Sequence, residues 1–160
     1  MMKIFGAARA QALVPLFLLF FAAAWLFGAG QASAASKYKS WTEIAEAMGV
    51  VLDDAYKAYD GGNSDAAFDL VNEAYFGFYE KEGFERNVKG RISGKRTSQV
   101  EYKFAVIKQK IRDGASKEEI RGHLSDLAGW LIEDAEKLDA RTQAQKQAQA
   151  AAQGQTEGGA

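Results

Sequence analysis

The sequence contains no cysteine, one proline and one histidine, and these shortages exclude several kinds of site. Without cysteine there is no disulfide, thiolate metal site, thiol nucleophile or c-type haem attachment. The one histidine, His123, has Ile120 three residues before it, so the Glu-x-x-His motifs of a four-helix di-iron oxidase are missing. No glycine-rich phosphate loop is present. We therefore expect no enzyme activity and no resident cofactor, and we expect His123 to lie beside an apolar helix face.

The first 35 residues have the features of an export signal. Lys3 and Arg9 make the start positive, residues 12–29 are largely apolar, and residues 32–34 read Ala-Ser-Ala, which favours cleavage before Ala35. An uncleaved membrane anchor is the alternative, because about 18 apolar residues nearly span a bilayer. Both interpretations predict an exported protein, in the periplasm or on the outer face of the plasma membrane, and an anchor would also hold it at the membrane.

The rest of the chain is one small, mildly acidic domain. A length of 160 residues leaves room for a single domain with tails. The formal net charge is −1. Loss of Lys3 and Arg9 with the signal leaves a net charge of about −3, whereas nucleic-acid binding needs a positive field. We therefore expect no nucleic-acid partner.

Apolar residues recur at helical spacing in this domain, and no stretch alternates long enough to form a sheet. The sequence predicts an all-α fold: a small four-helix bundle over residues 36–140 with a kinked third helix. Residues 141–160 are rich in Ala, Gln and Gly and predict a linker or tail. Because Ala and Gln favour helix, the last helix should extend into this tail before it frays.

Local signals predict the helix ends. Ser40 and Ser116 are each followed three residues later by glutamate, which is capping-box spacing. Residues 61–63, Gly-Gly-Asn, should end the first helix, and Ser64 should cap the second, which runs to about residue 81. Within residues 84–112 the line of apolar side chains along the helix changes its direction by roughly 130° around the helix axis. Because the shift falls at a Ser-Gly pair, a kinked helix or two short helices are expected there.

Aromatic residues concentrate near the end of the second helix. One apolar stripe is enough to pack a helix on a core. At about 100° per residue this stripe consists of Ala67, Leu70, Val71, Ala74 and Phe78. Phe76 and Tyr79 fall outside the stripe. We therefore expect these two side chains on a surface with a role other than core packing.

Several sequence blocks in this region belong together. They read Tyr-Phe-Gly-Phe-Tyr-Glu at residues 75–80, Gly-Phe-Glu at 83–85 and Ile-Ser-Gly-Lys-Arg at 92–96, after Trp-Thr-Glu-Ile at 41–44 and Asp-Ala-Tyr-Lys-Ala-Tyr at 54–59. In this order the blocks resemble the N-terminal extracytoplasmic domain of bacterial Ftr-type high-affinity iron permeases. The resemblance covers residues 41–139.

The resemblance implies a part in iron uptake. Such permeases carry paired Arg-Glu-Gly-x-Glu motifs in membrane helices, and this sequence has no such motif. What is implied is therefore the extracytoplasmic portion of a permease or a free-standing relative. Its expected partners are ferric iron, as a bound substrate, and the membrane domain of a permease or other uptake subunits.

Carboxylates are the candidate iron ligands, because hard cations favour oxygen ligands. The resemblance places Glu80 and Glu85 around the turn at Gly83, where two helices can converge, and Glu101 would join them from the third segment. We take Glu80, Glu85 and Glu101 as candidate metal ligands. Glu80 also projects from the face opposite the core stripe, where ordinary solvated charge belongs, and that interpretation stays open.

The second hypothesis is a structural interaction module of the cell envelope that binds a partner subunit without metal. A loop around Gly94 would present Lys95 and Arg96 to an acidic partner or to lipid headgroups. Phe76 and Tyr79 would add aromatic contacts. The alternative for these cations is simple pairing with neighbouring glutamates.

Overall fold

The computed structural model describes residues 37–157, with side chains described through residue 153. All regular secondary structure in this range is helical, which confirms the predicted all-α class. The elements in chain order are α1 (Trp41–Asp60), α2 (Ser64–Asn72), the π-helix η1 (Glu73–Glu80), α3 (Phe84–Arg91), α4 (Gly94–Arg112) and α5 (Lys117–Glu157). The predicted export signal lies outside the described residues.

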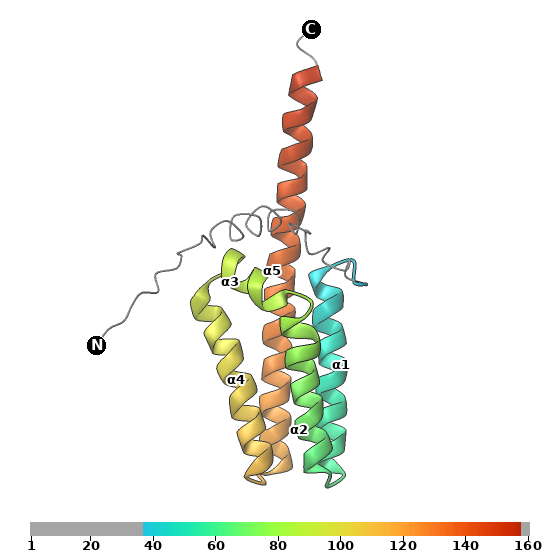
Figure 1. Ribbon diagram of the computed structural model, residues 1–160, viewed down its shortest axis with the longest axis vertical. Coiled ribbons are helices and arrows are strands. Elements are labelled where there is room, and N and C mark those ends of the chain that lie inside the picture. The colour runs from blue at the N-terminus through green and yellow to red at the C-terminus, as the bar shows by residue number, and fades with distance from the viewer. Residues whose placement is uncertain (1–36, 158–160) are drawn as a thin grey trace, which may run out of the picture. The chain divides into compact units, whose positions relative to one another are not determined.

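The long helices pack side by side around one apolar core (Figure 1). Helix α1 packs against α2 and α5, and α4 packs against the same two helices. The α1–α2 and α4–α5 turns lie at one end of the helices, and η1 and α3 lie at the other end. Helix α3 contacts η1, α4 and α5, so it closes the core at that end.

The predicted capping serines are confirmed. Ser40 Oγ accepts a hydrogen bond from the Glu43 amide at 3.1 Å, and Ser116 Oγ does the same for the Glu119 amide. The prediction for Ser64 is wrong, because the cap of α2 is Asn63, whose Oδ1 accepts from the Ala66 amide at 3.0 Å. Asparagine and serine are similarly good caps, so adjacent candidates are not separated by sequence alone.

The π-helix changes which side chains enter the core. In η1, Ala74 and Tyr79 are both fully buried, although they are five residues apart, whereas Phe78 is only half-buried. Hydrogen bonds from i to i+5 widen the helix, so residues five apart share a face. The prediction that Phe78 continues the core stripe and Tyr79 lies outside it is therefore wrong. Phe76 is 54% exposed, as predicted.

The third segment consists of two helices, α3 and α4. Ile92 and Ser93 separate them, and Ser93 has extended backbone angles and accepts a hydrogen bond from the Arg96 amide at 3.1 Å. This is the second of the two predicted forms, and residues 84–112 contain no continuous kinked helix. The break lets α3 turn across the end of the core while α4 runs along it.

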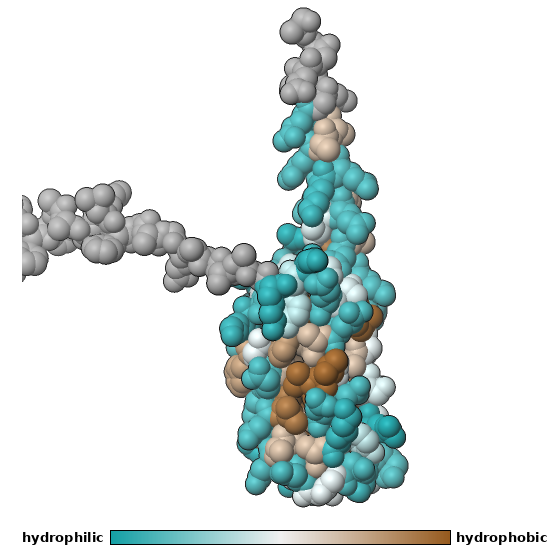
Figure 2. Space-filling view, turned by 90° about the vertical axis from the view of Figure 1, so that its right-hand side faces the viewer, coloured by the Kyte–Doolittle hydropathy of each residue, from teal (hydrophilic) through white to brown (hydrophobic). Residues whose placement is uncertain are grey.

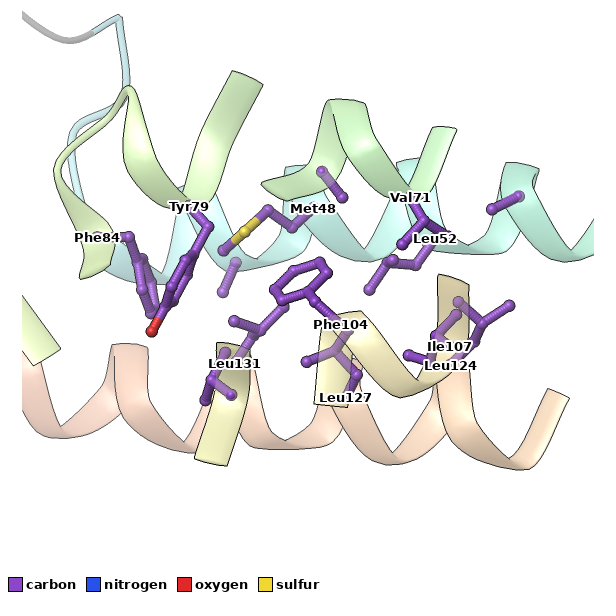
Figure 3. Packing of buried hydrophobic residues seen from close by; sticks show 14 of the residues in the cluster. Met48, Leu52, Val71, Tyr79, Phe84, Phe104, Ile107, Leu124, Leu127 and Leu131 are labelled. Atoms are coloured by element: carbon purple, nitrogen blue, oxygen red, sulfur yellow. The ribbon is translucent and has the colours of Figure 1, made fainter. Parts of the chain in front are cut away.

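The apolar stripe of α5 is confirmed in full. Its members, all buried, are Ile120, Leu124, Leu127, Leu131, Ala135 and Leu138. They face buried residues of α1, α2 and α4, among them Leu52, Val71 and Phe104 (Figure 3).

Helix α5 continues to Glu157, well beyond its last buried residue, Leu138. This agrees with the expectation that the last helix extends into the Ala/Gln-rich tail. The projecting part is covered mostly by hydrophilic residues (Figure 2). Within residues 37–157, none of the helices combines the length and apolar character needed to cross a membrane.

Candidate functional site

The three candidate ligands come from three different elements. Glu80 ends η1, Glu85 lies in the first turn of α3, and Glu101 lies on α4. Gly83, between the first two, has φ of +75°, a conformation that glycine adopts without strain and that reverses the chain between η1 and α3. Glu80 is exposed, whereas Glu85 and Glu101 are half-buried.

Two tyrosines of η1 lie where these elements meet. The ring centroids of Tyr75 and Tyr79 are 5.9 Å apart, and both rings pack on Phe104 of α4, at 5.1 and 5.8 Å. Phe104 follows Glu101 by one helical turn, so both side chains lie on neighbouring positions of the same helix side. Phe84, the residue before Glu85, packs on Tyr79 at 5.8 Å. The aromatic contacts thus hold α3, α4 and η1 together at the candidate site.

The neighbouring carboxylates raise the pKa of both phenols, in addition to the larger effect of burial. Burial raises the pKa of Tyr75 to about 12, together with a hydrogen bond to the Glu80 carboxylate and the charges of Glu101 and Glu85. Burial also raises the pKa of Tyr79, and the charges of Glu101 and Glu85 add to that effect. Carboxylates disfavour phenolate formation because they make the surroundings negative. The same negative surroundings attract a cation.

The hydroxyl of Tyr79 is the one buried side-chain N or O atom within residues 37–153 that has no hydrogen-bond partner. In Figure 3 the Tyr79 ring lies beside Phe84, with its oxygen at the end that points away from η1. Tyr79 was predicted to bind a partner at the surface. That prediction is wrong, because its side chain is fully buried.

The glutamates do not make a carboxylate cage by themselves. In the part of the chain that the structure describes, no three His, Cys, Asp or Glu residues lie close enough to hold one ion. Any ion bound by Glu80, Glu85 and Glu101 would therefore need other oxygen donors, and the neighbouring phenols of Tyr75 and Tyr79 are such donors.

Arg96 is not part of an open basic surface. Its Nε donates to both carboxylate oxygens of Asp134, at 2.9 and 2.8 Å, and one terminal nitrogen donates to the Trp130 carbonyl at 3.2 Å. Its guanidinium also lies 4.9 Å from the centre of the Trp130 ring. The Arg96 side chain is only 17% exposed, and the contact with a partner stays a prediction. Gly94 begins α4, and Lys95 beside it is exposed.

Asp134 is the fully buried partner in this pair. Burial raises its pKa, while the adjacent Arg96 charge acts in the opposite direction. The ion pair joins the first turn of α4 to α5 across 38 residues of sequence. Asp134 lies three residues after Leu131 and four before Leu138, on the apolar stripe of α5. A charged residue on this buried face was the signal that sequence analysis missed.

Phe76 and His123 lie where the sequence predicted. The exposed Phe76 ring packs edge-on against Tyr75 at 4.9 Å, and Lys108 Nζ lies 5.8 Å from its centroid. His123 is half-buried beside the α5 stripe, with Nδ1 at 2.9 Å from Lys103 Nζ.

A contact that sequence analysis missed joins the middle of α5 to the start of α1. Asp139 accepts hydrogen bonds from the amides of Trp41 and Thr42, at 2.9 and 3.0 Å, and from the Thr42 hydroxyl at 2.8 Å. A carboxylate at a helix N-terminus is favourable because the first amides there lack intrahelical partners. Asp139 therefore anchors α5 to the start of α1.

Comparisons of the chain with protein-family profiles, curated proteins and solved structures gave no match. The resemblance to the iron permease domain thus stays a prediction from the sequence blocks described above.

Proposed function

We propose that this chain is an extracytoplasmic iron-binding domain, a four-helix bundle related to the N-terminal domain of Ftr-type permeases, that binds ferric iron and hands it over for import. Ferric iron is the substrate of this process. The site is the acidic and phenolic cluster formed by Tyr75, Tyr79, Glu80, Glu85 and Glu101.

The observation that carries this proposal is that the three elements bearing Glu80, Glu85 and Glu101 meet at Tyr75 and Tyr79. Both rings pack on Phe104, one helical turn after Glu101, and Phe84, the residue before Glu85, packs on Tyr79. Burial raises the pKa of Tyr75, and the three carboxylates add to that effect. Charge clusters that serve only solubility face water and have no reason to meet around a half-buried phenol. Hard cations favour such oxygen donors and negative surroundings.

The exposure of the three glutamates suits capture and release. Glu80 is exposed at the end of η1, whereas Glu85 and Glu101 are half-buried behind it. An ion would first meet Glu80 and then the more buried donors. A site open on one side can return its ion to an acceptor, as a delivery role requires.

A second candidate function is supported by the exposed Phe76. A large aromatic side chain that is 54% exposed, beside Lys108, is typical of a residue that contacts a partner. In this alternative, Phe76 and the exposed Lys95 would bind another subunit of the envelope without metal.

Titration calorimetry of the purified full chain with ferric nitrilotriacetate separates the two functions. The Glu85→Gln/Glu101→Gln variant removes two charges at nearly constant size, and we expect it to weaken binding by more than about tenfold, since even outer-shell changes at metal sites cost that much.

The matched control is Glu46→Gln/Glu136→Gln, which removes the same charge from exposed positions on α1 and α5. Equal affinity of both double variants would exclude the proposed site. No binding by the unaltered chain would favour the partner-binding alternative.

A further inference from the structure

We propose that Tyr79 is a direct ligand of the bound ferric ion, through its phenolate oxygen, together with Glu85 and Glu101. This inference rests on the proposed function and makes it specific.

The Tyr79 side chain is fully buried, and no group in the described part of the chain pairs with its hydroxyl oxygen. Buried polar groups in native proteins nearly always have a partner, and each exception needs an explanation. A phenylalanine would fill the same space without that cost. A hydroxyl kept in this position is explained if the oxygen binds something the free protein does not contain.

The π-helix η1 turns Tyr79 into the core. Because residues five apart share a face in a π-helix, Tyr79 lies on the buried face with Ala74 and points between α3 and α4. An α-helix would have placed Phe78 there instead. Single π-turns often occur at functional sites. The ring is then fixed by Phe84 at 5.8 Å and Phe104 at 5.8 Å. A ligand held by packing on two sides keeps its position before the ion arrives.

The Tyr79 ring lies beside the two elements that carry Glu85 and Glu101. It packs on Phe84, the residue before Glu85, and on Phe104, one helical turn after Glu101. The charges of both glutamates also act on its phenol. Asp134 also acts on it, but both of its oxygens are already bonded to Arg96. Two glutamates and one phenolate carry three negative charges, which match the charge of a ferric ion.

Binding needs no redox step. The Tyr79 O–H bond breaks as the iron–oxygen bond forms, the proton leaves to solvent past the half-buried Glu85, and iron stays ferric. Metal binding to protonated ligands releases protons in this way. The two-carboxylate, one-phenolate set also agrees with the observation that no three carboxylates in the described chain hold an ion together.

Visible absorption tests the inference, because ferric phenolates absorb visible light by charge transfer from the phenolate oxygen, whereas ferric carboxylates do not. We would titrate ferric nitrilotriacetate into the full chain and record both the spectrum and the affinity. The expected result is a visible band that appears with binding. Tyr79→Phe should remove the band and weaken binding by more than about tenfold.

Tyr102→Phe serves as the matched control. It removes a hydroxyl from a side chain that is 72% exposed on α4, and it should keep both the band and the affinity. Iron binding that depends on Glu85 and Glu101 but gives no band, or a band that survives Tyr79→Phe, would overturn the ligand assignment and leave the proposed function standing.

The remaining outcomes are equally decisive. No iron binding by the unaltered chain would overturn the proposed function and this inference together. The iron-free Tyr79→Phe variant should be at least as stable as the unaltered chain, because an unsatisfied hydroxyl is removed. A less stable variant would show that the hydroxyl has a structural partner, and the inference would be withdrawn.

Discussion

Replacement of Arg96 by methionine tests the account of the α4–α5 contact. The change keeps an unbranched side chain over Trp130 but removes the charge that neutralises Asp134. Asp134 would remain fully buried, without the two hydrogen bonds of 2.9 and 2.8 Å that it now accepts. A buried charge without a partner is strongly destabilising.

The expected loss in unfolding free energy is about 3–5 kcal/mol, the range for breaking a buried ion pair from one side. That is a large part of the total stability of a small domain, which is about 5–15 kcal/mol. The double variant Arg96→Met/Asp134→Leu should recover most of the loss, because replacing both partners with apolar residues leaves no unpaired charge.

Urea unfolding followed by tryptophan fluorescence measures these changes. The pH dependence has a definite sign: burial raises the pKa of Asp134, and loss of the opposing Arg96 charge should raise it further. The folded variant then favours the protonated carboxyl, so its deficit relative to the unaltered chain should shrink as pH falls through that raised pKa. A loss under about 1 kcal/mol, the value for surface pairs, or a pH-independent deficit, would refute this reasoning.

Three further predictions concern stability. Leu127→Ala should lower the free energy of unfolding by about 2–5 kcal/mol, measured by urea unfolding, because Leu127 is fully buried in the α5 stripe. A loss smaller than half the lower limit of this range would contradict the packing of α5 on the core. Tyr79→Phe should raise the free energy of unfolding of the iron-free chain by about 1–3 kcal/mol in thermal or urea unfolding. A loss of stability would contradict the conclusion that the Tyr79 hydroxyl is unsatisfied. Asp139→Ala should cost about 1.5–3 kcal/mol, because three hydrogen bonds to a charged acceptor are lost. Asp139→Asn, which keeps one acceptor oxygen, should cost less, and equal losses would argue against the capping role.

Features set by nearby residues could be predicted from the sequence. Ser40 and Ser116 cap helices through amides three residues away, so the spacing alone contains the information. The stripe of α5 follows from 3.6-residue periodicity, because the helix is regular where it is buried. The break near Ser93 was visible as a shift of the apolar line.

Features that depend on distant contacts could not be predicted. The periodicity of an α-helix placed Tyr79 outside the core, because a π-helix is selected by packing and has no simple sequence signal. Arg96 looked like a surface cation because its partner, Asp134, is 38 residues away. The packing of Tyr79 on Phe84 and Phe104, next to Glu85 and Glu101 in the chain, likewise needs the fold.

The location of bound iron is the most direct test of the central claim. Crystals of the full chain grown with ferric nitrilotriacetate would be measured at the iron absorption edge, where anomalous scattering identifies the metal. We predict one strong iron peak within bonding distance of Tyr79 Oη and of the Glu85 and Glu101 carboxylates. Absence of a peak there, or a peak only at exposed carboxylates elsewhere, would contradict it.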